Sequence, residues 1–153
     1  MLVGILSDTH GLLRPAALDA LRGSNLIIHA GDIGRADIVE KLRGIAPVFA
    51  VRGNVDMQDW AGSLPNTQTV SVGVHKFHVL HDLSELSIDP VQAGMAAVIF
   101  GHSHKPSIET RDSVLYLNPG SAGPRRFTLP ICIARVLVSG KRVEPSIVHL
   151  DVR

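Results

Sequence analysis

Three short apolar runs in the first third of the chain alternate with two amphipathic segments. The runs cover residues 2–6, 26–30 and 48–51. Each has the length and composition of a strand buried in a parallel sheet. Pro15 suits the start of the first intervening helix, and Gly23 and Gly44 suit the ends of the first and second. This β-α-β-α-β order predicts an α/β fold with a parallel sheet and right-handed crossovers.

The remainder of the chain is richer in strands. We expect a hairpin around Gly73, a short helix near residues 90–95, and a turn at Ser139-Gly140-Lys141 between the last two strands. The expected strands are residues 67–72, 76–81, 98–100, 114–117, 131–138 and 142–150. The chain has 153 residues with no internal repeat and no linker, which is the size of one ordinary domain. We therefore predict a single domain, residues 1–153, built from a mixed sheet pair covered by helices.

Composition excludes several classes of protein. A hydrophobic fraction of 45% rules out global disorder, and a net charge of +1 argues against binding nucleic acid through a strongly basic face. No apolar stretch approaches the roughly 20 residues that a membrane span requires. The opening apolar run also lacks the basic region of a signal peptide. We expect a cytoplasmic location and no membrane partner.

Polar side chains follow five of the expected strands, at the point where each strand ends. They are Asp8, His10, Asp32, Asn54, His81, His102 and His104. Functional sites of open α/β sheets lie at the carboxyl ends of the strands, so we expect these side chains to converge. Imidazole and oxygen ligands without a thiolate suit Mn, Fe, Zn, Ni or Co. Seven candidates exceed the three protein ligands that are typical of one open site, and they suit two ions about 3.5–4 Å apart.

Individual candidates also have ordinary structural interpretations. Asp32 suits the N-cap of a helix that begins near Ala36, and Asn54 suits a simple turn. His29 lies within an apolar strand, and we interpret it as a core histidine that hydrogen-bonds near the site rather than as a ligand. The ordered occurrence of all five segments at strand ends favours the metal site.

Several short motifs occur in a fixed order along the chain. They are Asp8-Thr9-His10, Gly31-Asp32, Gly53-Asn54-Val55-Asp56, His81, Gly101-His102-Ser103-His104 and Asn118-Pro119-Gly120-Ser121 with Pro124-Arg125 after it. This set resembles the calcineurin-like metallophosphoesterases, specifically their small single-domain phosphodiesterase branch. The resemblance covers nearly the whole chain. It implies a four-layer α/β/β/α sandwich of two mixed sheets flanked by helices.

The resemblance also implies a ligand set and a reaction. Asp8, His10, Asp32 and His104 would hold one divalent ion, and Asp32, Asn54, His81 and His102 would hold the other, with Asp32 bridging the two. A hydroxide between the ions, of which Mn²⁺ is the favoured identity, would attack the phosphorus of a small phosphodiester. Asn118, Gly120, Ser121 and Arg125 would bind substrate or support the ligands.

Two positions depart from the family pattern. Many relatives carry a histidine at the position of Val55, where it serves as a general acid. Either the metals alone stabilise the leaving group here, or another residue such as Asp56 takes that role. Relatives usually have glycine at the position of Asp82. This carboxylate would orient His81, tune metal preference or repel anionic substrates.

Other functions remain open at this point. A retromer subunit resembles this fold and serves mainly as a protein-interaction surface, so a scaffold is the main alternative. A phosphomonoesterase is chemically close. A nuclease is disfavoured because 153 residues leave no room for capping or DNA-binding segments. Relatives often form oligomers, which leaves a homo-oligomer open.

Overall fold

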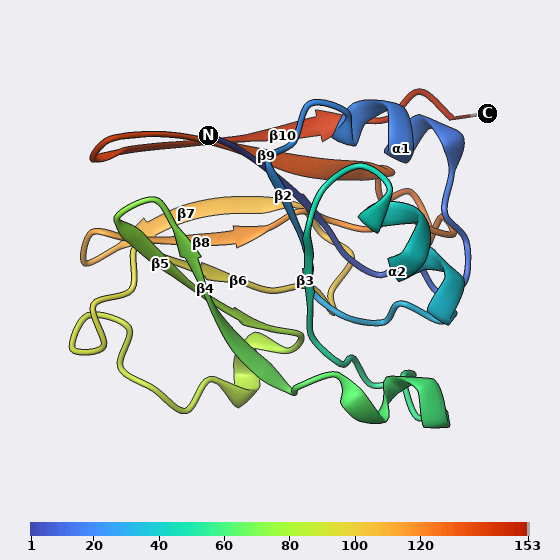
Figure 1. Cartoon of the computed structure of the whole chain (residues 1–153), viewed down its shortest axis with the longest axis horizontal. Helices are drawn as coiled ribbons and strands as arrows, with labels where there is room; N and C mark the ends of the chain where they lie inside the picture. Colours follow the sequence, from blue (N-terminus) through green and yellow to red (C-terminus); the bar gives the residue numbers. More distant parts are fainter. Residues whose placement is uncertain (153) are drawn as a thin grey trace.

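The computed structural model describes residues 1–152 and contains two five-stranded sheets packed face to face (Figure 1). Sheet A has the order β10-β9-β1-β2-β3, formed by β1 (Leu2–Leu6), β2 (Leu26–His29), β3 (Val48–Ala50), β9 (Cys132–Ser139) and β10 (Arg142–His149). Sheet B has the order β4-β5-β6-β8-β7, formed by β4 (Thr67–Val72), β5 (His75–Leu80), β6 (Ala97–Ile99), β7 (Ser107–Arg111) and β8 (Val114–Asn118).

Both sheets mix parallel and antiparallel pairs: sheet A has antiparallel strands on one side only, whereas sheet B has them at both edges. β1, β2 and β3 pair in parallel, whereas β9 pairs antiparallel with β1, and β10 with β9. In sheet B, β5, β6 and β8 are parallel, with β4 and β7 antiparallel at the two edges. The prediction of two mixed sheets in an α/β fold is confirmed. The parallel strands also place several carboxyl ends at the same end of each sheet, which positions the site described below.

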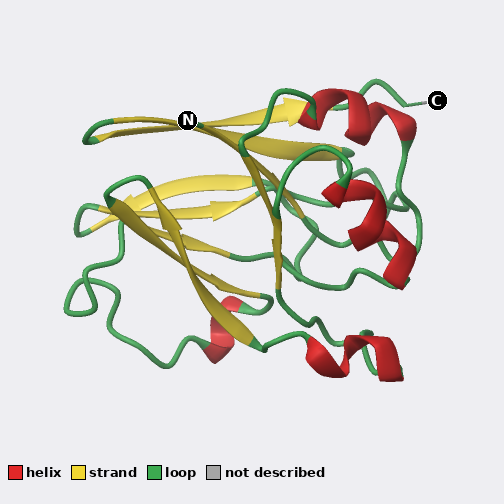
Figure 2. Ribbon diagram, in the orientation of Figure 1, coloured by secondary structure: helices red, strands yellow, loops and turns green. Residues whose placement is uncertain are grey.

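Two α-helices cover the outer face of sheet A (Figure 2). α1 (Pro15–Leu21) begins at a proline, whose fixed φ suits the first turn, and α2 (Ala36–Arg43) buries one apolar side. Gly4 of β1 lies beneath α1, and a Cβ there would clash with the side chain of Leu21. The missing side chain therefore lets the helix pack closely on the strand. Among residues 1–152, no helix is long and apolar enough to cross a membrane.

The main core lies between the two sheets. Inward-facing residues of sheet A, such as Ile5 and Ile28, pack with Phe77, Val79 and Ile99 of sheet B, and all five are almost completely buried. Burial of a side chain of this size stabilises a fold by roughly 1.5–3 kcal/mol. The alternating inward residues thus fix which side of each sheet faces the other.

The outer face of sheet B is covered by a short turn of 3-10 helix and by loops. η2 (Leu83–Glu85) places Leu83 against an apolar cluster that includes Val98 and Tyr116. A second 3-10 helix, η1 (Asp59–Ser63), lies in the connection from β3 to β4. The expectation of a helix near residues 90–95 is wrong: the segment forms turns, and Gly94 has a φ of 71°, outside the helical region.

Candidate metal centre

Backbone hydrogen bonds connect the loops that follow four of the parallel strands. Asp8 N donates to the Gly31 carbonyl at 3.0 Å, and His10 N donates to the Asp32 carbonyl at 2.9 Å. In sheet B, Gly101 N donates to the His81 carbonyl at 2.9 Å. These bonds hold the strand ends at fixed spacing, so side chains far apart in sequence meet at one end of the molecule.

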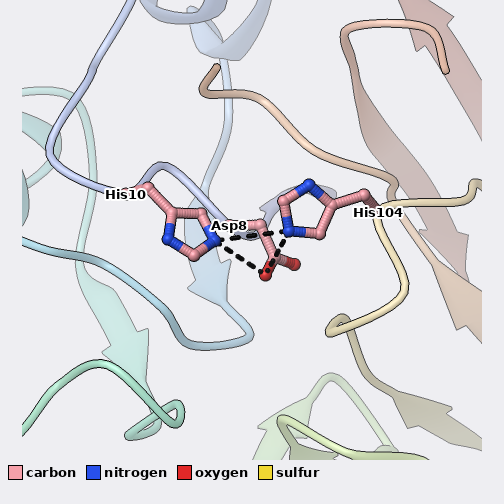
Figure 3. Close-up of side chains that lie close together, drawn as sticks. All are labelled: Asp8, His10 and His104. Atoms are coloured by element: carbon pink, nitrogen blue, oxygen red, sulfur yellow. Dashed lines mark hydrogen bonds and ion pairs between the residues drawn. The ribbon is translucent and has the colours of Figure 1, made fainter. Parts of the chain in front are cut away.

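Asp8, His10 and His104 form a first group of converging ligand atoms (Figure 3). Asp8 Oδ1 lies 3.5 Å from His10 Nε2 and 3.2 Å from His104 Nε2. The two imidazole Nε2 atoms are 3.3 Å apart. Three ligand atoms therefore face one another from the loop after β1 and the loop after β6, an arrangement able to hold one divalent cation.

Asp8, Asp32 and His81 form a second group that overlaps the first. His81 Nε2 lies 3.1 Å from Asp32 Oδ2 and 3.9 Å from Asp8 Oδ1. Asp32 Oδ2 is also 3.5 Å from His10 Nε2. Both carboxylates thus lie between the two groups, which is the placement expected of residues that contact a pair of cations.

Buried polar atoms without hydrogen-bond partners support a cation site here. Asp8 Oδ1 and His81 Nε2 are buried, and within residues 1–152 neither of them has a hydrogen-bond partner. Such atoms are uncommon and costly in folded proteins. His81 Nδ1 lies 2.7 Å from the Ala30 carbonyl and donates to it, which leaves the Nε2 lone pair directed at the carboxylates. Two carboxylates with oriented imidazoles fit divalent metal ions.

The electrostatics of the group favour positive charge. Burial alone would raise the pKa of Asp32, but the nearby His81 imidazole and the Val55 amide, which donates to Asp32 Oδ1 at 3.0 Å, lower this pKa to about 2. Burial opposes protonation of His81, yet Asp32 and Asp8 together raise the pKa of His81 above its usual value. The carboxylates remain ionised near neutral pH and attract a cation to the histidines.

His102 and Asn54, the remaining two predicted ligands, lie at the margin of this cluster. The His102 side chain is 45% exposed, its ring centroid is 5.2 Å from that of His81, and its Nε2 is 3.8 Å from Asp82 Oδ2. Its backbone amide donates to Asp8 Oδ2 at 3.1 Å. Asn54 is exposed and lines a cleft beside His81. The structure therefore brings five of the seven candidates into contact and places the other two beside them.

Five of the predicted ligands have left-handed backbone conformations, which are uncommon for residues other than glycine. Their φ angles are 58° at Asp8, 46° at His10, 55° at Asp32, 73° at His102 and 63° at His104. Strained backbone of this kind persists where surrounding structure enforces it, and it clusters at functional sites. The conformation bends the chain sharply after each strand and directs the side chain toward the shared space.

Asn118 and Ser121 support the ligand loops through hydrogen bonds. Asn118 Nδ2 donates to the Gly101 carbonyl at 3.0 Å, and its Oδ1 accepts from Gly120 N at 2.9 Å. Ser121 Oγ donates to the carbonyl of Asp8 at 3.0 Å. Arg125, in contrast, is exposed and donates to the Leu129 carbonyl within its own loop. The Asn-Pro-Gly-Ser turn thus connects the His102 loop to the Asp8 loop.

His29 is fully buried beneath the site. Its Nδ1 accepts from the Gly31 amide at 3.1 Å, and its Nε2 lies 3.0 Å from Thr9 Oγ1. Because Thr9 donates its own proton to the Ile33 carbonyl, His29 Nε2 is the donor in that contact. Burial lowers the pKa of His29 to about 4, so the ring is neutral and holds the Asp8 and Asp32 loops together.

Asp56 has a structural role that the sequence did not reveal. Its carboxylate is completely buried and accepts hydrogen bonds from three backbone amides, those of Ile33, Gly34 and Gly53, at 3.0–3.1 Å. This carboxylate therefore fixes the loop after Asp32 against Gly53, where an added Cβ would clash with the Asp32 side chain. The geometry does not support Asp56 as a general acid, because its oxygens face backbone amides.

Asp82 caps η2 and lies beside His102. Its Oδ1 accepts from the amide and the hydroxyl of Ser84 at 3.0 and 2.8 Å. We expect Asp82→Gly to keep full metal occupancy, because His81 is oriented by the Ala30 carbonyl rather than by Asp82. Replacing the cap by glycine should cost only a few tenths of a kcal/mol of stability. Metal content by plasma mass spectrometry checks this, and loss of one metal equivalent would assign Asp82 a direct part in metal binding.

Comparison with known proteins gives consistent results. A family profile described as a calcineurin-like phosphoesterase superfamily domain matches residues 1–141. A probable metallophosphoesterase from Methanothermobacter thermautotrophicus is 30% identical over 161 residues, covering 97% of this chain and 92% of the relative. The structure of an archaeal phosphodiesterase has a TM-score of 0.78 at 24% identity, covering 97% of this chain and all of that one. Vps29 from Entamoeba histolytica, solved with Zn²⁺, has a TM-score of 0.77 at 22% identity, covering 97% and 99% of the two chains.

Proposed function

Because the chain belongs to the calcineurin-like phosphoesterase superfamily, we propose that it is a metal-dependent phosphodiesterase with two divalent cations. The observation that carries this proposal is the pair of overlapping ligand groups around Asp8, in which buried carboxylate and imidazole atoms lack other partners. A purely structural cluster would satisfy these atoms with hydrogen bonds.

Each cation would have its own set of protein ligands. Asp8, His10, Asp32 and His104 would hold one cation, and Asp32, Asn54, His81 and His102 would hold the other. Asp32 Oδ2 supports this assignment because it lies within 3.5 Å of imidazole nitrogens from both sets. His102 and Asn54 lie beside this cluster and would complete the second set. Mn²⁺ is the first cation to test, since the donor set suits several metals.

The bound cations would lower the pKa of water and neutralise charge on the phosphoryl oxygens. Hydrolysis then forms one bond from a water oxygen to phosphorus and breaks one ester bond, and the alcohol leaves with a proton from that water. The chain's part is positioning: Asn118, Ser121, His29 and Asp56 fix the loops that carry the ligands. Val55 supplies no proton, so leaving-group stabilisation would depend on the metals.

The surroundings of the site leave room for an ester substituent. A cleft of about 290 Å³ adjoins His81 and is lined by Arg52, Gly53, Asn54, Asn66, Asp82 and Glu85. This volume can take an ester substituent while the phosphoryl group lies at the cations. A phosphomonoester could place its single substituent in the same cleft, so the relative rates on bis-p-nitrophenyl phosphate and p-nitrophenyl phosphate are needed to distinguish the two activities.

We expect hydrolysis of bis-p-nitrophenyl phosphate in the presence of Mn²⁺, loss of that activity on chelation, and recovery when Mn²⁺ is restored. Removing the cations removes the activated water, so residual turnover should be at background level. Release of p-nitrophenol measures the reaction. Turnover that survives complete chelation, verified by metal analysis, would contradict the proposal.

The second candidate function is a protein-interaction scaffold. The close structural likeness to Vps29 favours keeping it, although that likeness establishes only the fold. Absence of turnover with Mn²⁺, Ni²⁺, Co²⁺ and Zn²⁺ would make the scaffold the leading function, and metal content would then report on structure alone.

A further inference from the structure

The cleft beside His81 has a distinctive charge pattern. It forms where the end of β3 meets the start of β4 and the end of β5. Thr67 of β4 pairs with Leu80 of β5, so Asn66 and His81 lie at the same end of this hairpin. Arg52 joins the cleft from β3 and donates from its backbone amide to the Pro65 carbonyl at 2.8 Å.

Two carboxylates form one wall of this cleft. Asp82 is the N-cap of η2 and Glu85 is its last residue, and both line the cleft. Among residues 1–152, neither carboxylate forms an ion pair with a lysine or an arginine. Asp82 Oδ1 accepts from the Ser84 amide, and Asp82 Oδ2 lies 3.8 Å from His102 Nε2. Glu85 is exposed.

The cleft also contains one cation and one unsatisfied donor. Arg52 Nη2 donates to the Leu64 carbonyl at 3.0 Å, whereas its Nε is buried without a hydrogen-bond partner. His81 Nε2, also without a partner, belongs to a side chain that is only 5% exposed. The Arg52 side chain and two carboxylates thus line one cleft, a pattern that suits a ligand with both signs of charge better than it suits an anion.

We propose that this cleft selects phosphodiesters in which one alcohol substituent carries a primary ammonium group. The inference rests on the proposed phosphodiesterase activity and assigns its substrate class. The phosphodiester anion faces the cations and Arg52, and the ammonium faces Asp82 and Glu85. A primary ammonium is favoured over a quaternary one because, among residues 1–152, no tryptophan, tyrosine or phenylalanine lines the cleft, whereas carboxylates and the amide oxygens of Asn54 and Asn66 accept N–H donors.

Two matched esters test the proposal. p-Nitrophenyl 2-aminoethyl phosphate and p-nitrophenyl propyl phosphate have nearly the same size and differ in the ammonium group. Each exposed ion pair contributes at most about fivefold in affinity, so two carboxylates predict roughly tenfold higher kcat/KM for the aminoethyl ester. This preference should decrease as NaCl is added, because salt screens exposed charges. Phosphorus NMR of the products identifies which ester bond breaks.

Carboxylate variants assign the preference to the cleft. Glu85→Gln should lower the ratio of the two kcat/KM values by about threefold, and Asp82→Asn with Glu85→Gln should bring it close to one. Glu109→Gln removes the same charge from an exposed position on β7 and should leave the ratio unchanged. The metal content of each variant is measured as well. If the double variant loses metal, the ratio of the two kcat/KM values in Glu85→Gln alone tests the proposal.

The outcomes separate the two proposals. If the holoenzyme hydrolyses neither ester, the proposed phosphodiesterase function fails. If it hydrolyses both at equal rates, prefers the propyl ester, or keeps its preference for the aminoethyl ester in Glu85→Gln, the activity stands and the ammonium selectivity is overturned. A tenfold preference that disappears with the carboxylates establishes the substrate class.

Discussion

Asp32→Ala should reduce phosphodiester turnover by far more than the roughly 100-fold that loss of a residue supporting a metal ligand costs. Asp32 Oδ2 lies 3.1 Å from His81 Nε2 and 3.5 Å from His10 Nε2, so both proposed cations lose the same carboxylate. We also expect the metal content to fall below two equivalents. Turnover of bis-p-nitrophenyl phosphate at saturating Mn²⁺, with metal analysis of the same sample, measures both effects.

A matched variant separates this effect from a general loss of negative charge. Asp37 is a partly exposed aspartate in the first turn of α2, and Asp37→Ala should keep the activity and metal content of the parent protein. Circular dichroism of both variants verifies the fold. Retained turnover of Asp32→Ala at saturating metal would exclude the bridging arrangement.

Asp56→Ala should lower the free energy of unfolding by about 3 kcal/mol or more. The substitution leaves three buried backbone amides without an acceptor, and each unsatisfied buried donor costs roughly 1–3 kcal/mol. Because these amides belong to the loops around Asp32 and Gly53, activity should fall as well. Urea denaturation in the presence of a chelator measures the stability of the chain without any contribution from bound metal.

The neighbouring Asp59 provides the control for this experiment. It is exposed in η1, three residues further along, and Asp59→Ala should change stability by no more than about 0.5 kcal/mol. If Asp56→Ala were as stable as the parent protein yet inactive, Asp56 would act in the chemistry and the structural assignment made above would be wrong.

Much of the fold was predictable because its signals are local. Apolar runs of strand length, with Pro15 and Gly23 bounding a helix, identified the parallel half of sheet A. The rule that parallel strands share one functional edge then indicated where the candidate ligands meet. β7 was missed because all five of its residues are exposed, so an edge strand with one paired side shows no apolar alternation.

Contacts between segments that are distant in the sequence could not be predicted from local sequence patterns. Asp56 accepts amides 22 and 23 residues earlier in the chain, and nothing in its immediate sequence marks it as buried. The Asp82–Ser84 cap, in contrast, had a readable signal, since aspartate often accepts from the amide two residues later. The charge pattern of the cleft beside His81 depends on the meeting of three segments, which only the tertiary structure defines.

Because five proposed metal ligands have left-handed backbone conformations, substitutions that stabilise the fold at these positions would remove side chains that the proposed activity needs. Glycine adopts that backbone conformation freely, whereas another residue typically pays about 1–2 kcal/mol. Directed evolution that selects only for survival of heating would therefore enrich replacements such as His102→Gly. The resulting proteins would be more stable to heat but would lack a proposed metal ligand. Any campaign to adapt this chain to industrial temperatures must screen turnover alongside heat tolerance, and should look for its gains in sites such as the exposed edge strand β7.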